Sequence, residues 1–259
     1  MIFKGTITFR APIKGNGLQF TRVEFNPQEP GVEKVQLQGQ DGREIRGTIY
    51  LASVESKEVG KNIVKKVLAA TFGRLSFNHN IAIENAYIIE SQFAPLHPHP
   101  GASITPDTGD LDVTGEKAIL AFRYPAETIK AELEQSSPHG ARYFGLFRSA
   151  RLSESPVEEF IHLYNLLLMF LGEDQKAVDV FILREAPGTP LTPSGNPKAK
   201  VGELETIYTR LRNELGHHRE GVNLDDTKAE MANRVGELAA LTKRAIELRP
   251  EILREGGST

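Results

Sequence analysis

Ser155-Pro156-Val157-Glu158 is the stretch that divides this chain into two kinds of structure. The order is typical of a helix start, because a serine side chain caps the first amide groups, a proline suits the first helical position, and a glutamate two residues later completes a capping box. The sequence therefore predicts a helix from Ser155 to about Gly172. Its second half is apolar on nearly all sides, which is typical of the central helix of a bundle.

Upstream of this helix, the sequence is typical of strands. Runs rich in β-branched and aromatic residues stand between turn signals. They cover residues 2–11, 32–38, 45–54, 81–93 and 118–124. One long helix is expected from Glu58 to about Phe77, because apolar residues recur there roughly at helical spacing. These residues are Val59, Ile63, Val67, Ala70 and Leu75.

Downstream of residue 172, the pattern is mostly helical. Residues 174–184 fit either a helix or a strand, and the proline-rich residues 185–202 predict a loop. A helix is expected over residues 203–216. A last helix should begin after Asp225 or Asp226, which would be its N-cap. One side of this last helix is formed by Met231, Val235, Leu238, Thr242 and Ala245. We therefore expect an α+β protein with a strand-rich domain, residues 1–148, and an all-α domain, residues 149–259.

Composition excludes several classes of function. The chain of 259 residues contains no cysteine, which removes disulfides, thiolate zinc sites and cysteine nucleophiles and is compatible with the cytoplasm. The first five residues run directly into strand-like sequence, so they do not resemble a signal peptide. The most apolar stretch, residues 163–171, is too short to span a bilayer. We expect a cytoplasmic protein without a membrane segment.

The sequence gives no reason to expect a metal or a cofactor. His97 and His99 each precede a proline in the segment from residue 94 to residue 115. No carboxylate or third histidine stands close to them in the sequence, so a loop is favoured over a metal site. The chain lacks a glycine-rich phosphate loop, a Gly-x-Ser-x-Gly elbow and a His-Glu-x-x-His motif.

Arg212-Asn213-Glu214-Leu215-Gly216-His217 closes the helix expected over residues 203–216. On a helical wheel, the apolar stripe consists of Leu204, Ile207, Tyr208, Leu211 and Leu215. Arg212, Asn213 and His217 fall on the opposite side, so we expect them to face away from the core and to form one polar site. The alternative is an ordinary solvated helix end, where the helix dipole favours arginine and histidine.

An Arg-x4-His pattern at the end of a helix, after a capped buried helix and a proline-broken loop, resembles the HEPN-domain ribonucleases of the ApeA type. More narrowly, the chain resembles the MauJ family of methylamine-utilisation proteins. The resemblance covers residues 155–248, and over the N-terminal half only the layout matches. It implies a helical domain that dimerises, so that two motif helices form one composite site, and RNA cleavage that needs no metal.

The resemblance further implies the roles of single residues. Arg212 and His217 would act on the RNA backbone, and Asn213 would orient the imidazole or bind the phosphate. Imidazole suits the base that activates a ribose 2′-hydroxyl near neutral pH, and guanidinium suits the phosphorane. His218 would either assist His217 or lie in solvent, the second being favoured, and Tyr208 is a further candidate for binding.

Net charge does not favour a strong, nonspecific RNA binder. The chain carries −3, and from residue 150 onward 14 Lys or Arg face 18 Asp or Glu, which gives −4. The preceding residues have 17 against 16, or +1, and Glu214 and Glu220 flank the motif. RNA would therefore be recognised locally, bound weakly or delivered by a partner. The alternative function is a non-catalytic HEPN module for dimerisation or binding, acting as an accessory protein in methylamine utilisation or defence, with a protein partner.

Overall fold

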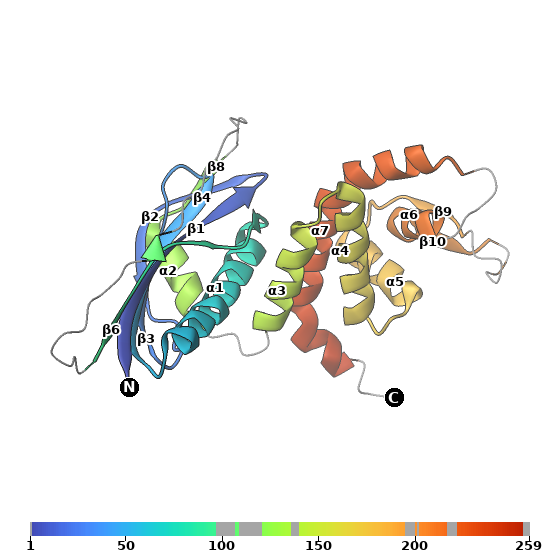
Figure 1. The fold of residues 1–259 in the computed structure, drawn as a ribbon. Coiled ribbons are helices and arrows are strands. Elements are labelled where there is room, and N and C mark those ends of the chain that lie inside the picture. Colours follow the sequence, from blue (N-terminus) through green and yellow to red (C-terminus); the bar gives the residue numbers. More distant parts are fainter. Residues whose placement is uncertain are drawn as a thin grey trace. The chain divides into compact units, whose positions relative to one another are not determined.

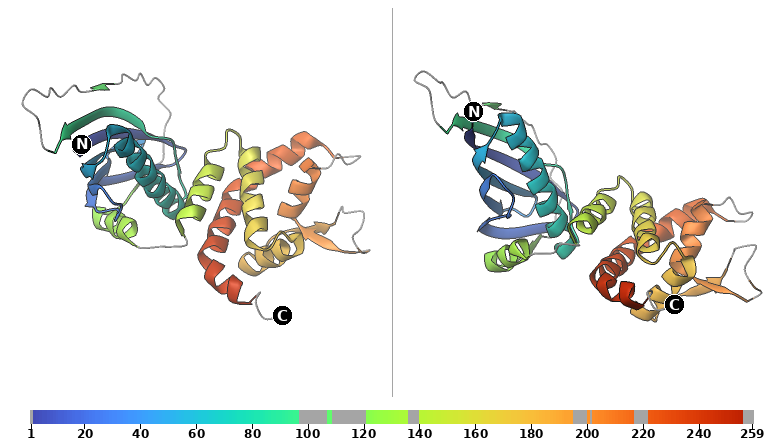
Figure 2. Two further views of the ribbon diagram at one scale, coloured as in Figure 1. Left: turned by 60° about the horizontal axis from the view of Figure 1, so that its bottom comes forward. Right: turned by 90° about the horizontal axis from the view of Figure 1, so that it is seen from below.

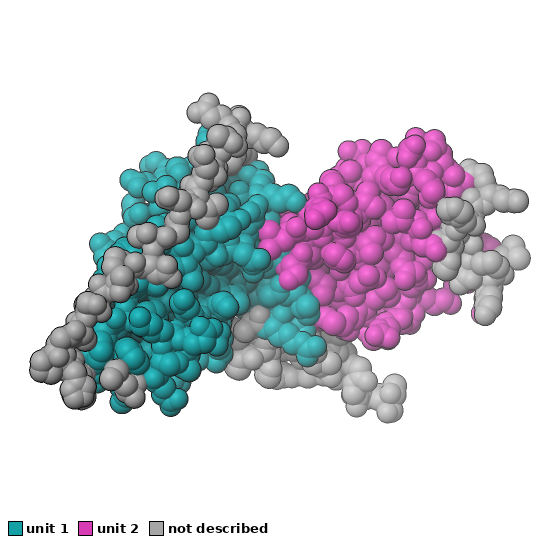
Figure 3. Space-filling model, viewed as in Figure 1, with its two compact units in different colours: residues 1–148 teal, residues 149–259 magenta. Residues whose placement is uncertain are grey.

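The chain folds into two compact units, residues 1–148 and residues 149–259 (Figure 3). The computed structural model describes residues 2–96, 107–108, 121–135, 140–194, 200, 202–216 and 222–255. The fold is α+β, with a strand-rich first unit and a mostly helical second unit (Figure 1). His97 and His99, considered above as metal ligands, lie outside the described residues. None of the described helices combines the length and the apolar character needed to cross a membrane.

The first unit is built on one curved sheet (Figure 2). Its strands are β1 (Phe3–Lys14), β2 (Gly17–Phe25), β3 (Val32–Gly39), β4 (Glu44–Val54), β5 (Ala82–Ile83), β6 (Tyr87–Pro95), β7 (Asp107–Thr108) and β8 (Ala121–Arg123). Their order is β7-β6-β1-β4-β3-β2-β8, with β5 paired to the end of β1. Neighbours are antiparallel except for β2 and β8, which run parallel.

Two helices cover one face of this sheet, α1 (Lys57–His79) and α2 (Ala126–Glu134). The apolar core lies between them and the inward side chains of β1 to β4, for example Ile7, Phe9 and Leu37, which are at most 1% exposed. The expected long helix is confirmed, and the Ser56 hydroxyl caps it by accepting from the Val59 amide.

The buried side of α1 does not include every apolar residue that indicated the helix. Val59 is 39% exposed and Ala70 is also exposed. The helix instead buries Val64, Val67, Leu68, Phe72 and Leu75. Those residues recur at spacings of three and four, which forms a more complete stripe than the one chosen from the sequence.

The other face of the sheet carries polar side chains. Along β1, residues alternate between the core and this outer face, as a strand requires. Register then sets outer-face side chains opposite one another on neighbouring strands: Arg10 opposite Arg46, Arg46 opposite Gln38, and Gln19 opposite Arg123. One end of the outer face therefore combines arginines with glutamines.

Three elements of the first unit, besides the two-residue strand β7, were missed from the sequence. In β2, a register shift between Phe20 and Val23 interrupts the alternation of buried residues, which hides the strand. Helix α2 buries only Ile129 and Leu133 and has no side-chain cap, so its periodic signal is weak. Helix α3 (Gly140–Arg151) begins in the first unit and ends in the second, beyond the expected boundary at residue 148.

The second unit contains four helices in its described part and one β-ribbon. Its elements are α4 (Pro156–Phe170), α5 (Gln175–Glu185), β9 (Leu191–Pro193), β10 (Leu204–Thr206), α6 (Ile207–Gly216) and α7 (Leu224–Glu255). The helix start at Ser155 is confirmed: its hydroxyl accepts from the Glu158 amide at 3.2 Å, and Pro156 follows at the first helical position. The Glu158 carboxylate reaches the Glu154 amide, one residue beyond a standard capping box.

The unit departs from an all-α domain where β9 and β10 pair antiparallel. Pro193 stands opposite Leu204, and the ribbon takes up residues expected to be loop and helix. As a result α6 begins at Ile207 and not at residue 203. The ambiguous segment after residue 174 is helix α5 with Asp174 as N-cap. Asn223, and not Asp225 or Asp226, stands before α7 and accepts from the Asp225 amide.

Candidate functional site

Helix α6 has two buried sides, not one. Ile207, Tyr208 and Leu211 are at most 3% exposed, as the apolar stripe predicts, but Leu204 lies on β10 and is 52% exposed. Asn213 is only 4% exposed, so the expectation that it faces away from the interior was wrong. The cause is a second layer of contacts, because the side of α6 opposite Leu211 meets α5 and β10.

Three hydrogen bonds fix the Asn213 carboxamide. Its Oδ1 accepts from Gln175 Nε2 at 3.0 Å and from Arg212 Nη1 at 3.1 Å, and its Nδ2 donates to Glu205 Oε2 at 3.3 Å. Glu205, itself 4% exposed, also accepts from the Ser194 hydroxyl at 3.2 Å. Since the carboxylate can only accept, it turns the amide nitrogen toward itself and the amide oxygen toward Arg212. Asn213 therefore holds the guanidinium through a fixed acceptor.

Arg212 differs from the other arginines of the second unit. The side chains of six arginines of this unit are described, Arg212 among them. Each of the other five forms at least one ion pair with a glutamate: Arg151 with Glu159, Arg184 with Glu185, Arg210 with Glu214 and Glu230, Arg234 with Glu230 and Glu237, and Arg244 with Glu185 and Glu247. Arg212 is half-buried and has no carboxylate within 4.0 Å among the described residues. Its positive charge is thus held in place by an amide and has no ion-pair partner in the described part of the chain.

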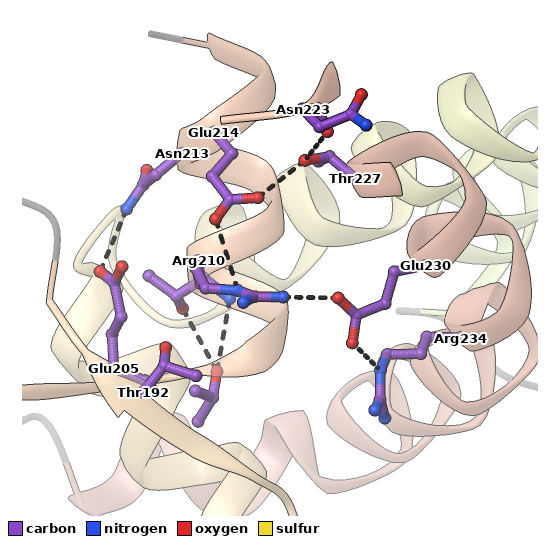
Figure 4. A network of polar contacts seen from close by, with 11 residues as sticks. Thr192, Glu205, Arg210, Asn213, Glu214, Asn223, Thr227, Glu230 and Arg234 are labelled. Atoms are coloured by element: carbon purple, nitrogen blue, oxygen red, sulfur yellow. Dashed lines mark hydrogen bonds and ion pairs between the residues drawn. The ribbon is translucent and has the colours of Figure 1, made fainter. Parts of the chain in front are cut away.

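Glu214, which flanks the motif, is occupied by other partners (Figure 4). Its carboxylate lies 3.5 Å from Arg210 Nε and accepts from the Thr227 hydroxyl at 2.8 Å. Arg210 also pairs with Glu230 on α7, so this part of the network links α6 to α7. Because Arg210 offsets the charge of Glu214, repulsion of a phosphate by this residue is weaker than the sequence suggested.

A chain of hydroxyl groups runs beneath the same helix. Asp179 Oδ1 accepts from the Thr206 hydroxyl and from the Thr209 hydroxyl, each at 2.6 Å. Thr209 Oγ1 lies 2.7 Å from the hydroxyl of Tyr164, which is fully buried. Burial raises the pKa of the Tyr164 hydroxyl, so this phenol stays protonated and serves as a structural hydrogen-bond donor.

Tyr208 lies on the side of α6 that faces α7. Its hydroxyl donates to Glu237 Oε2 on α7 at 2.8 Å, and burial together with this carboxylate raises the pKa of the Tyr208 hydroxyl. Its ring stacks on Phe160 with 6.2 Å between ring centroids. It borders a cavity of about 720 Å³ between α7 and residues 185–190. The structure therefore does not bring Tyr208 to the Asn213 carboxamide, and a binding role for it stays a prediction.

The two histidines of the motif, His217 and His218, lie outside the described residues. Among the residues that the structure describes, no three His, Cys, Asp or Glu side chains are grouped as a metal site would require. Sequence reasoning missed Gln175, Ser194 and Glu205, which come from three separate segments and carry no shared spacing. Only the fold brings them to Asn213.

Comparisons of the chain with models of known protein families, with curated proteins and with solved structures found no match. Function is therefore inferred from the side chains of the site.

Proposed function

We propose that the second unit is a metal-independent endoribonuclease in which Arg212 binds the scissile phosphate and His217 acts as the base. The observation that supports this function is the guanidinium of Arg212, which is oriented by a buried amide and has no carboxylate partner among the described residues. A bound phosphodiester would supply the missing negative charge, and guanidinium binds such a group through two parallel hydrogen bonds.

The proposed reaction is an internal transesterification. The ribose 2′-oxygen forms a bond to the adjacent phosphorus, the bond from phosphorus to the 5′-oxygen breaks, and the products carry a 2′,3′-cyclic phosphate and a 5′-hydroxyl. The His217 imidazole takes the proton of the 2′-hydroxyl, and Arg212 stabilises the charge that develops on the phosphorane. Asn213 serves as a positioning residue, because its buried carboxamide contacts Arg212 and not the solvent side.

The proposal includes a homodimer formed through the second unit. One protomer supplies one Arg212 and one His217, whereas transfer of a proton to the leaving 5′-oxygen requires an acid as well as a base. Two copies of the motif at one interface would supply both groups, and the two-fold symmetry of such an interface would place them opposite each other.

Cleavage assays in EDTA test this function. Wild-type protein should cut RNA to 2′,3′-cyclic phosphate ends, identified by mass spectrometry, and Arg212→Ala and His217→Ala should each abolish the cut. Arg212→Lys keeps the charge but loses the planar fork, so it should retain a small part of the activity. His218→Ala should be nearly silent. Arg184→Ala is the matched control, since this arginine is ion-paired on α5.

Two results would remove the nuclease assignment: wild-type protein that cuts no RNA, or an Arg212→Ala/His217→Ala double variant that cuts as well as wild type. The function then supported is a non-catalytic binding module with a protein partner. Apolar side chains exposed on the second unit favour that alternative, namely Val180 at 67%, Leu204 at 52% and Leu191 at 45%. A net charge of −4 from residue 150 onward agrees with it.

A further inference from the structure

The first unit contains a cavity of about 670 Å³ where β2, β3 and β8 meet the start of α2. This volume lies in the range of small-molecule sites. It is lined by polar side chains of the outer sheet face together with apolar groups of Phe20, Tyr124 and Pro125. The polar side chains include Gln19, Arg22, Gln38, Gln40 and Arg123. The cavity therefore lies at the end of the sheet that combines arginines with glutamines.

Arg22 and Arg123 bring two positive charges to this cavity. Arg22 Nη2 donates to Gln36 Oε1, and Arg123 Nε donates to Gln19 Oε1 at 3.3 Å. Both acceptors are neutral amides, and within the described part of the chain neither guanidinium has a carboxylate within 4.0 Å. On the same sheet, by contrast, Lys34 pairs with Glu24 and Arg46 pairs with Glu44. Glu24 also interacts with the charge of Arg22, but Lys34 pairs with that carboxylate, so the two cavity arginines leave a local excess of positive charge that favours an anion.

The glutamines of the cavity supply neutral hydrogen-bonding groups. Gln19 is already engaged, because its Nε2 donates to the Gln40 carbonyl at 2.7 Å and its Oε1 accepts from Arg123. The carboxamides of Gln38 and Gln40 have no hydrogen-bond partner among the described residues. Each offers two donors and an acceptor side by side, which matches the edge of a nucleobase.

We infer that this cavity binds one nucleotide of a single-stranded RNA, with its phosphate between Arg22 and Arg123 and its base against Gln38 and Gln40. This inference rests on the proposed function, since it names the form of RNA that the protein selects. A duplex hides the base edges that the carboxamides would contact, whereas an unpaired base can enter the cavity. The N-terminus of α2 carries the positive end of the helix dipole, and Pro125 provides no side-chain cap there. This dipole adds to the positive potential that the two arginines produce in the cavity.

The test is a binding titration of the full chain carrying His217→Ala, which prevents cleavage. The probe is a short fluorescein-labelled single-stranded RNA in EDTA, followed by fluorescence anisotropy at several salt concentrations. Arg22→Gln/Arg123→Gln should weaken binding about tenfold or more, because two hydrogen bonds to a charged phosphate are lost. The slope of log Kd against log salt should fall by about 0.7, because the contact to one phosphate of a single strand is lost.

The matched control is Arg142→Gln, an exposed arginine of the same unit that borders no part of this cavity. It removes one charge and should change the affinity little. Gln38→Ala/Gln40→Ala leaves the net charge unchanged, so it should keep the salt slope while altering the preference among homopolymeric RNAs. This variant also tests the site if the arginine variant fails to fold, as judged by circular dichroism.

Several outcomes would overturn the inference. The first is a folded Arg22→Gln/Arg123→Gln variant that binds RNA as tightly as the parent, and the second is an Arg142→Gln variant that loses as much affinity per removed charge. The third is equal affinity for the same sequence as a duplex. The fourth is displacement of the labelled RNA by adenosine 5′-monophosphate at equal nucleotide concentration. The last result would assign the cavity to free nucleotides. Because binding is measured without cleavage, a wild-type protein that binds by this cavity but cuts no RNA would remove the nuclease proposal alone.

Discussion

Asn213→Ala separates the structural and the chemical parts of the Arg212 site. The substitution removes three hydrogen bonds, to Gln175, Arg212 and Glu205. Gln175 and Arg212 are partly exposed, so water can replace the lost amide for both. Glu205 is 4% exposed and loses a donor in the interior, although Ser194 still donates to it.

The loss at Glu205 sets the magnitude. Leaving a buried charged acceptor without one of its donors costs about 1.5–3 kcal/mol, and the two partly exposed partners add little. We therefore expect the free energy of unfolding to fall by about 2–3 kcal/mol. Arg212→Ala removes a single hydrogen bond from a half-buried side chain and should cost less than about 1 kcal/mol.

Urea denaturation followed by circular dichroism at 222 nm measures both variants, because the helices of the second unit contribute strongly to that signal. RNA cleavage is measured in parallel, and Asn213→Ala should lose most of the activity although it does not contact substrate. If Asn213→Ala unfolds within about 0.5 kcal/mol of wild type, the network around Glu205 does not carry the free energy assigned to it.

Asn213→Asp adds a test by pH. It sets a second carboxylate beside buried Glu205, and repulsion between the two negative charges destabilises the folded state while both are ionised. The folded state then takes up a proton more readily than the unfolded state, so the penalty is largest near pH 7 and decreases as the pH falls. A penalty that is constant between pH 7 and pH 5 would contradict the contact.

Other predictions concern single elements. Ser155→Ala should lower the free energy of unfolding by about 1 kcal/mol through loss of the α4 cap, and an unchanged urea midpoint would contradict it. Gly47→Ala should cost about 1–3 kcal/mol, because the added Cβ would lie 2.3 Å from the Gln36 carbonyl oxygen. At Gly145 in α3 an added Cβ would meet no atom within 4 Å, so Gly145→Ala should stabilise the protein by up to about 1 kcal/mol. Thermal unfolding of the two glycine variants compares these opposite effects. Light scattering should give a dimer at micromolar concentration, and a monomer would exclude a composite site.

Local signals decided what the sequence could predict. The Ser155 cap and the α1 helix were found because their signals lie within a few neighbouring residues. Asn213 was misplaced because a helical wheel assumes one buried side, whereas α6 contacts α7 on one side and Gln175 with Glu205 on another. The cavity beside Arg22 and Arg123 joins residues about a hundred positions apart, and no pattern along the chain marks such a contact.

The single oxygen Oδ1 of Asp179 has a consequence for how the second unit opens. It accepts from Thr206 on β10 and from Thr209 on α6, while Thr209 in turn meets Tyr164 on α4. Separating any one of these elements would leave a carboxylate or a buried hydroxyl without its partner, which is unfavourable. Amide protons in α4, α5, β10 and the first turn of α6 should therefore exchange with solvent through one shared opening event, with similar protection factors, so that this part of the unit behaves as a single foldon.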